Sequence, residues 1–237
     1  MQHSYSIIRL VAASKRYYPS YLSHESWMSS SYINSKEYTI PLGQSRYGGP
    51  IMDVPAHFTP PNDLYFAGQL NLNVLAKEDV TDLLPKTGHL YFFADIRKNI
   101  GKVFYFDIAT EALIRHTHEH EQTFWYGVLI DDGVAETELW QDRYKSVEDE
   151  DDLPYANADG NLWDSFEGSN ISKIFGIFTH CQKSEQEITA IMEKDLLVLW
   201  QIGENGFNDE GVFSVLIPKQ DLIHLNFDNC SFYWGQT

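Results

Sequence analysis

The segment RHTHEHE, residues 115 to 121, holds the side chains that could most directly do chemistry. His116, His118 and His120 recur at every second position, so an extended chain directs all three imidazoles to one face. Zinc, nickel or copper would accept three such ligands together with a carboxylate or water. A metal-dependent enzyme is therefore one hypothesis. Adventitious metal affinity and a solvated surface strand are the alternatives, and the helical HExxH signature is absent from the sequence.

Other catalytic signatures are also missing from the sequence. The GxSxG elbow of serine hydrolases does not occur, and GENG (203–206) lacks the Lys and the Ser or Thr of a phosphate-binding loop. Cys181 directly follows His180, and such neighbours seldom form a nucleophile and base pair, because adjacent side chains on a strand point apart. We therefore assign no catalytic residue, no metal ligand and no cofactor.

The net charge of −17, from 17 Lys and Arg against 34 Asp and Glu, is concentrated in one part of the chain. Residues 108–170 carry three cationic and sixteen acidic side chains, a net charge of −13. Nucleic-acid phosphates demand Lys and Arg, so this balance argues against a nucleic-acid partner. An acidic surface instead attracts basic proteins.

Aromatic residues are interleaved with these acids, a composition typical of a protein interface with buried rings and a charged rim. The alternative is that the rings only attach an exposed acidic segment to the body of the protein. The leading hypothesis is a non-enzymatic interaction protein that binds a basic protein partner, such as an immunity protein that neutralises a toxin domain. The candidate partner-binding residues are Asp131, Asp132, Glu136, Glu138, Trp140, Tyr144, Glu148, Asp149, Glu150, Asp151, Asp152 and Trp163.

A third hypothesis is a small-ligand-binding protein with an aromatic pocket between two related halves of the chain. Gln69 and Gln201 could line such a pocket, and hydrogen bonding of these two side chains within the sheet is the alternative.

The sequence also indicates a compartment. Cys181 and Cys230 match no CxxC spacing, so a disulfide framework is not supported. The first ten residues, MQHSYSIIRL, have no basic region ahead of their apolar run, which argues against a signal peptide. No apolar stretch approaches the roughly 20 residues of a membrane span. We expect a soluble, cytoplasmic protein without a membrane partner.

Helices and loops are predicted from periodicity and from capping residues. Residues 1–42 show no clear period and predict a loop with one short element at most. A helix is expected over 73–84, where Pro85 ends it, and another over 184–194, which Ser184 and Glu187 begin as a capping box.

Strands are predicted where β-forming residues alternate or run together between turn residues. SRYGGP (45–50) predicts a turn, and so does Asp131-Asp132-Gly133. The acidic stretch 141–169 predicts an exposed excursion. Apolar residues on both faces of 89–96 and 102–108 favour a sheet covered on both sides. The expected strands are 64–72, 89–96, 102–108, 123–130, 196–202, 211–217 and 229–235.

A weak internal repeat emerges from this order. In each half a strand containing a glutamine, Gln69 or Gln201, is followed by a connection, a glycine, a second strand, a loop and a third strand. We interpret this order as a duplicated sheet motif.

Five separated blocks stand out along the chain: SRYGGP (45–50), YFAGQLNL (65–72), LLPKTGHLYFFAD (83–95), SKIFGIF (172–178) and residues 196–234. In this order they resemble the YwqG-like family, a bacterial domain family of unknown function. The resemblance implies an α+β fold of mostly antiparallel sheets, in which two related halves fold together with a few short helices. It implies no agreed activity and no catalytic residue.

The length and composition favour one globular unit, so we expect a single YwqG-like domain over 1–237. Its expected parts are a divergent segment 1–42, a first half 43–107, an acidic middle 108–170 and a second half 171–237.

Overall fold

The computed structural model describes residues 4–117, 124–140, 171–180, 182–203 and 211–236. Contacts between residues divide the chain into two compact units, which we call unit 1 (residues 1–10 and 134–237) and unit 2 (residues 11–133). Two long strands, β1 (Ser4–Tyr18) and β9 (Gly127–Leu139), contribute to both units, because each boundary falls inside one of them. The predicted first half, 43–107, lies in unit 2, and the predicted second half, 171–237, lies in unit 1.

Strands dominate both units. Of the described residues, 47% lie in strands and 11% in helices, so the expected α+β class is wrong and the fold is mostly β. The physical reason is that apolar strand faces are covered by other strands and by loops more than by helices. Among the described residues the longest helix, α2 (Glu185–Met192), has only eight residues.

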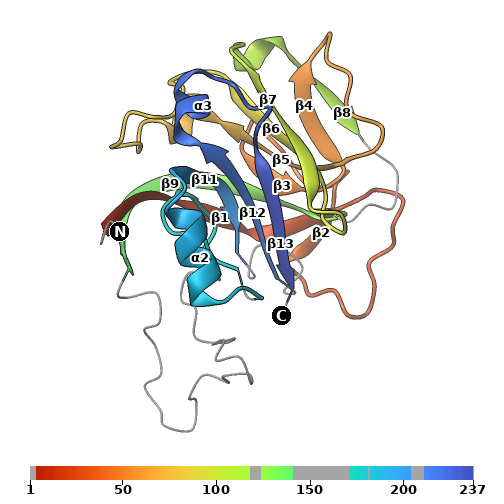
Figure 1. The fold of residues 1–237 in the computed structure, drawn as a ribbon. Coiled ribbons are helices and arrows are strands. Elements are labelled where there is room, and N and C mark those ends of the chain that lie inside the picture. The colour runs from red at the N-terminus through yellow and green to blue at the C-terminus, as the bar shows by residue number, and fades with distance from the viewer. Residues whose placement is uncertain (1–3, 118–123, 141–170, 181, 204–210, 237) are drawn as a thin grey trace, which may run out of the picture. The chain divides into compact units, whose positions relative to one another are not determined.

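Unit 2 is built on antiparallel strands in the order β9-β3-β5-β6-β7. The pair β4 and β8 forms a separate antiparallel sheet, and β2 runs parallel to the end of β1. A 3-10 turn, η1 (Thr110–Ala112), precedes β8 (Figure 1). The strands of this unit are β2 (Tyr32–Asn34), β3 (Arg46–Gly48), β4 (Ile51–Pro55), β5 (Tyr65–Asn71), β6 (His89–Asp95), β7 (Ile100–Phe106) and β8 (Leu113–Thr117).

The core of unit 2 explains why the sequence of β6 is apolar on both faces. Met52 and Val54 of β4 pack with Phe66, Tyr91 and Phe93, so β4 covers one face of β5 and β6. All seven residues of β6 are buried. The expectation of a sheet covered on both faces is confirmed at β6. It is wrong at β7, the last strand of the order, where only Val103 is buried and Lys102 is exposed.

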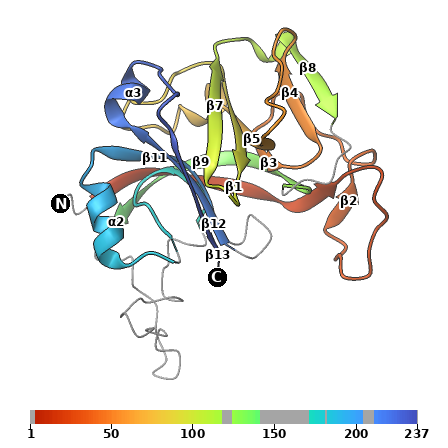
Figure 2. The same cartoon turned by 45° about the vertical axis from the view of Figure 1, so that its right-hand side comes forward.

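Unit 1 is built on the order β1-β10-β11-β12-β13, again antiparallel. Helix α2 is labelled in Figure 2. Its residues Ile188 and Ile191 pack against a core that includes Phe178, Val198 and Leu216. Ser184 and Glu187 form the predicted capping box at its start. The other elements of this unit are β10 (Lys173–Phe175), β11 (Leu196–Ile202), β12 (Gly211–Pro218), α3 (Lys219–Ile223) and β13 (Ser231–Gln236).

The helix expected over 73–84 is wrong beyond its first turn. Helix α1 (Leu72–Leu75) has four residues, with Asn71 as its N-cap. The carboxylate of Asp79 then accepts hydrogen bonds from backbone N–H groups that a helix would pair with carbonyls four residues earlier. Val80, counted toward the apolar helical face, is 71% exposed. The three N–H groups held by Asp79 are those of Thr81, Leu83 and Leu84.

Two other local expectations are also wrong. The first residues, expected as loop, contain the 15-residue strand β1, whose sequence shows no clear period because its inward and outward positions do not alternate regularly. The turn expected at Asp131-Asp132-Gly133 lies in the middle of β9. Both aspartates are exposed there, so the strand continues with its charges in water.

The internal repeat seen in the sequence corresponds to an equal order of strands in the two units. Arg46 of β3 pairs with Gln69 of β5 in unit 2, and Lys173 of β10 pairs with Gln201 of β11 in unit 1. Both glutamine strands are irregular a few residues before the glutamine, at 66–68 in β5 and at 198–200 in β11. The repeat is therefore present in register as well as in sequence.

Candidate functional site

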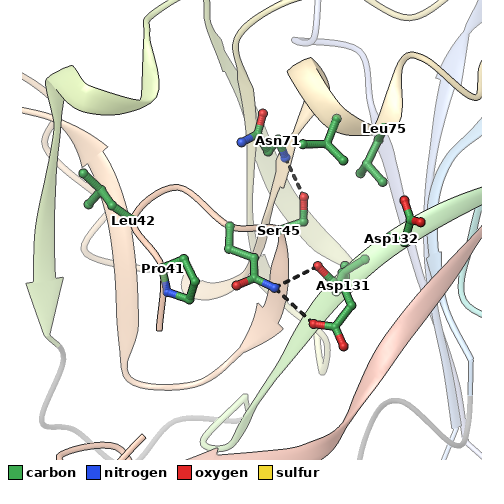
Figure 3. A pocket seen from close by; sticks show the side chains of 10 residues that line it. Pro41, Leu42, Ser45, Asn71, Leu75, Asp131 and Asp132 are labelled. Atoms are coloured by element: carbon green, nitrogen blue, oxygen red, sulfur yellow. Dashed lines mark hydrogen bonds between the residues drawn. The ribbon is translucent and has the colours of Figure 1, made fainter. Parts of the chain in front are cut away.

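A pocket of about 240 Å³ lies in unit 2, between the segment 41–45, helix α1 and the middle of β9 (Figure 3). Its apolar wall comes mainly from Leu42, Val74 and Leu75, and its polar wall comes from side chains rich in oxygen acceptors. The residues that line it are Pro41, Leu42, Gln44, Ser45, Asn71, Val74, Leu75, Ile130, Asp131 and Asp132.

Asp131 and Asp132 give the pocket its charge. Both are exposed, and neither forms an ion pair with a Lys or Arg among the described residues. The side-chain nitrogen of Gln44 donates to the Asp131 carboxylate at 3.2 Å and to the carbonyl of Ile130 at 3.3 Å (Figure 3). This orientation leaves the second carboxylate oxygen of Asp131 available to a ligand, since Gln44 occupies only Oδ1.

A buried ion network lies directly behind the segment that lines the pocket. Asp53 is completely buried and accepts hydrogen bonds from the guanidinium groups of Arg46 and Arg115 and from the N–H of Gly43. Arg46 is also completely buried, whereas the Arg115 side chain is 35% exposed. Two guanidinium groups thus share one carboxylate.

The network keeps Asp53 ionised. Burial alone would raise the pKa of this carboxyl, but the hydrogen bonds from Arg115, the charge of Arg46 and the Gly43 N–H together hold it below its ordinary value. The same carboxylate raises the pKa of Arg115 above its ordinary value, chiefly through their hydrogen bonds. Asp53 and the two arginines therefore stay charged inside the protein, because each of them is paired with an opposite charge.

The two arginines also fix the backbone that forms one wall of the pocket. Arg115 donates to the carbonyls of Ile40 and Pro41, and Arg46 donates to those of Pro41 and Gln44. Every one of these carbonyls lies in or next to the lining segment. The wall is held in place before any ligand binds, which lowers the entropy lost on binding.

Asn71 and Ser45 join the second wall to the first. The Ser45 hydroxyl accepts from the Asn71 N–H at 2.7 Å, and the Asn71 side chain donates to the Gly43 carbonyl at 3.3 Å (Figure 3). The Asn71 side chain also caps α1, the helix that supplies Val74 and Leu75. These bonds set the position of α1 against the segment 41–45.

Two buried polar groups of β6 lie near the network without hydrogen-bond partners of their own. Nδ1 of His89 and the hydroxyl of Tyr91 are both buried and unpaired among the described residues. Burial lowers the pKa of His89 to about 4, and burial raises the pKa of Tyr91 above its ordinary value. His89 is therefore neutral at neutral pH, and Nε2 contacts the Thr110 hydroxyl at 3.3 Å.

The predicted partner-binding acids of β9 are placed in different environments. Asp131 and Asp132 line the pocket, and Glu136 is exposed in a surface ion pair with Arg9 at 2.8 Å. Glu138 instead points inward, where it pairs with the completely buried Lys173 and accepts the N–H of Ile177 at 2.8 Å. Glu138 is thus the counter-ion of a buried lysine in unit 1.

The aromatic members of the predicted face are only partly described. Trp140 packs, partly buried, against the core cluster of unit 1 that contains Phe178 and Val198. Tyr144, Trp163 and the five acids from Glu148 to Asp152 lie outside the described residues.

The histidine cluster is also only partly described. His116 is exposed on β8, opposite Met52 of β4, and His118 and His120 lie outside the described residues. Within the described part of the chain, no three His, Cys, Asp or Glu side chains gather as metal ligands would.

The glutamines proposed to line a pocket between halves are each bonded inside their own unit. Gln69 accepts the Asp53 N–H and donates to the Gln44 carbonyl. Gln201 accepts the Thr179 hydroxyl and donates to the Ile171 carbonyl. Each side chain is completely buried, and its partners lie outside the sheet that contains the glutamine, on β4 and in the segments that flank β3 and β10.

Sequence reasoning did not find the residues that build the pocket apart from its two aspartates. Gln44 lies just before the predicted turn 45–50, and Asn71 lies in the predicted strand 64–72. One available signal was Arg115 at the head of RHTHEHE, a cation placed among acids. Its real partner is Asp53, 62 residues away, so spacing could not reveal the pair.

Comparison with known proteins identifies the family. A family described as a domain of unknown function, DUF1963, matches residues 18–235. The chain belongs to this family. No curated protein matches the chain. Among the described residues, no helix is long and apolar enough to cross a membrane.

Proposed function

We propose that this protein binds a basic protein partner and that the pocket of unit 2 receives a cationic group of that partner. The observation that carries the proposal is the pair Asp131 and Asp132: two exposed carboxylates without a cationic partner among the described residues, at the mouth of a pocket. An unpaired carboxylate beside fixed acceptors attracts a positive charge.

The rest of the chain adds long-range attraction to the same class of partner. The net charge is −17, so the field around the protein draws basic proteins and repels nucleic acid. The pocket contributes a preformed binding site, since the buried Arg46 and Asp53 and the partly exposed Arg115 hold its wall in place. Attraction by charge and a preformed acceptor site together support a binding role.

The finer parts of the proposal concern the biological setting. We propose that the chain is a YwqG-like member of its family and that it acts in the cytoplasm of a bacterium. There it would act as an immunity protein that neutralises a basic toxin domain. Charge complementarity of the kind described here is what such a role requires.

The test measures binding of short poly-L-lysine by calorimetry at about 50 mM and about 300 mM salt, a range over which screening changes strongly. We expect the affinity to fall as salt rises. We expect Asp131→Asn/Asp132→Asn to lower it by roughly tenfold at low salt, because two unpaired charges are removed.

The matched control is Asp63→Asn/Glu111→Gln. It removes the same two charges from exposed positions of unit 2 that do not line the pocket, so we expect less than about a twofold change. A third variant neutralises Glu148 to Asp152, the acid run of the predicted face. Binding that is indifferent to salt, to Asp131→Asn/Asp132→Asn and to neutralisation of Glu148 to Asp152 would contradict the proposal.

A further inference from the structure

The repeated strand order makes unit 1 an internal reference for the pocket of unit 2. In both units a serine occupies the residue before the buried cation, and it makes the same two hydrogen bonds. The carbonyl of Ser45 accepts from Ile130 N–H and the carbonyl of Ser172 accepts from Leu10 N–H, each at 2.8 Å. The two hydroxyls accept from Asn71 N–H at 2.7 Å and from Gly203 N–H at 3.0 Å.

The buried glutamines make a third matched bond. Gln69 donates to the carbonyl of Gln44, and Gln201 donates to the carbonyl of Ile171. Gln44 therefore corresponds to Ile171, and Asn71 corresponds to Gly203. The two residues that follow Ile130 in β9, Asp131 and Asp132, correspond to the two that follow Leu10 in β1, which are Val11 and Ala12.

The comparison separates two kinds of position. At positions that hold the strands together, the two units carry residues of the same type, as at Ser45 and Ser172 or at Ile130 and Leu10. Where the pocket is polar, the matched positions differ. Gln44, Asn71, Asp131 and Asp132 stand opposite Ile171, Gly203, Val11 and Ala12, of which Val11 and Ala12 lie on β1 just past the boundary of unit 1. The same strand arrangement thus forms without this polar set. Asn71 and Gln44 have structural bonds of their own, whereas Asp131 and Asp132 have no ion pair among the described residues, so a ligand is the better explanation of the two aspartates.

The size of the pocket limits that ligand. A cavity of about 150 Å³ holds a benzene-sized molecule, and drug-sized ligands occupy about 300 Å³ or more. The pocket, at about 240 Å³, lies between these limits. One long amino-acid side chain fits this range better than a cofactor does.

We propose that the pocket seats one arginine side chain of the basic partner. The guanidinium donates to the Asp131 carboxylate and the amide oxygen of Gln44, and the alkyl stem packs on Val74 and Leu75. Asp132 follows Asp131 on the strand, so its side chain points the other way and adds only its charge (Figure 3). This assignment rests on the proposed function, which it makes specific to one side chain.

Arginine suits this lining better than lysine for two reasons. Its planar group carries five donors, so it serves several fixed acceptors at once, whereas an ammonium is a point charge with three. The acceptors here are the Asp131 carboxylate and the Gln44 amide oxygen, which lie on different segments. A guanidinium is also more weakly hydrated, and so loses less on entering a pocket with an apolar wall.

The test compares hexa-arginine with hexa-lysine, which carry equal charge. We expect hexa-arginine to bind roughly tenfold more tightly at about 150 mM salt, since multiple charge-assisted bonds form only with the guanidinium. Two variants, Val74→Trp and Leu42→Trp, fill the pocket without changing charge. We expect each to lower hexa-arginine affinity to the hexa-lysine level, and thermal melting checks that they fold.

Val80→Trp is the control, because Val80 is exposed and does not line the pocket, and it must keep the preference for arginine. Equal affinity for the two peptides, with both weakened by salt and by Asp131→Asn/Asp132→Asn, overturns the arginine assignment but leaves the proposed function standing. Failure of both peptides to bind overturns both. Agmatine binding as tightly as hexa-arginine would show a free metabolite site and overturn the assignment to a protein side chain.

Discussion

Unit 1 and unit 2 share one strand order, but the buried cation of each unit has different ion-pair partners and a different exposure of its carboxylate. In unit 2 the completely buried Arg46 pairs with Asp53, which is itself completely buried and shared with Arg115. In unit 1 the completely buried Lys173 pairs with Glu138, whose side chain keeps 13% exposure. The planar guanidinium also bonds two carbonyls near the pocket, which gives unit 2 a fixed polar wall.

The difference teaches that a repeated scaffold can be modified where its strands carry side chains to the surface. The shared bonds of Ser45 and Ser172 hold each set of strands together. The positions around them are free to vary. In unit 2 those positions carry the acceptors of the pocket, and each prediction below tests one part of this comparison.

Loss of the buried cation has the largest expected effect. Arg46→Met leaves Asp53 buried with one partner fewer, so we expect the free energy of unfolding to fall by about 3–5 kcal/mol. Lys173→Met should cost about 2 kcal/mol, because water reaches Glu138 and the Ile177 N–H still donates to it. Urea denaturation measures both, and equal losses would contradict the comparison.

Acid should destabilise both units through one buried histidine in each. Burial lowers the pKa of His89 in unit 2 and of His180 in unit 1 from 6.5 to about 4. Below the unfolded pKa the unfolded chain takes up a proton that the folded chain refuses, so stability falls as pH drops from 6.5 toward 4. Each histidine should account for on the order of 3 kcal/mol at the acid end.

The measurement is the free energy of unfolding of His89→Leu and His180→Leu between pH 7 and pH 4. Each variant should lose less stability over this window than the unsubstituted protein, and by a similar amount. A pH dependence as steep as in the unsubstituted protein would show that the histidine is not neutral when folded. Below this window the protonation of Asp53 adds a further loss, because its folded pKa is lowered.

The matched serines should respond alike. Ser45→Ala leaves the Asn71 N–H unpaired, and Ser172→Ala leaves the Gly203 N–H unpaired. We expect each to destabilise by about 1–2 kcal/mol, since a buried donor is stranded. Thermal unfolding checks them, and values that differ by more than about 1 kcal/mol would break the equivalence of the two units.

Replacing the two pocket aspartates with the residues at the matched positions of β1 should have the smallest effect on stability. Asp131→Val/Asp132→Ala places the residues of β1 at exposed positions of β9, so we expect a change within about 0.5 kcal/mol. The same variant should lose binding to hexa-arginine. A large loss of stability would mean that the acid pair serves the fold, which would weaken the case for a ligand.

Much of the fold could be predicted from local sequence, and its errors have physical causes. The run LLVLWQI gave β11 with its observed bounds, because a short apolar run between turn residues favours a strand. The helix over 73–84 failed because Asp79 bonds three N–H groups that periodicity alone assigns to helical carbonyls. Side-chain competition for backbone donors does not appear in a count of apolar positions.

The candidate site was only partly predictable. Charge density pointed to Asp131 and Asp132, and the structure places both at the pocket. The same charge density also pointed to Glu138, but the Glu138 side chain points inward and pairs with Lys173. A carboxylate that faces water and one that pairs a buried lysine look the same in sequence, because only the register of the strand decides the direction of each side chain.

The amino-acid sequence by itself determined where most strands form and where α2 begins with its capping box. It also determined the acidity of the chain and the presence of a repeat with one glutamine in each half. Only the tertiary structure decided that Arg46 and Arg115 meet Asp53, and that Gln44 and Asn71 join Asp131 and Asp132 around one pocket. It also decided which positions of the repeat match these four and carry no such polar set. The reason is that strand propensity and helix capping depend on a few neighbouring residues, and net charge depends on the whole chain. Pairing of strands far apart in sequence decides which side chains become neighbours.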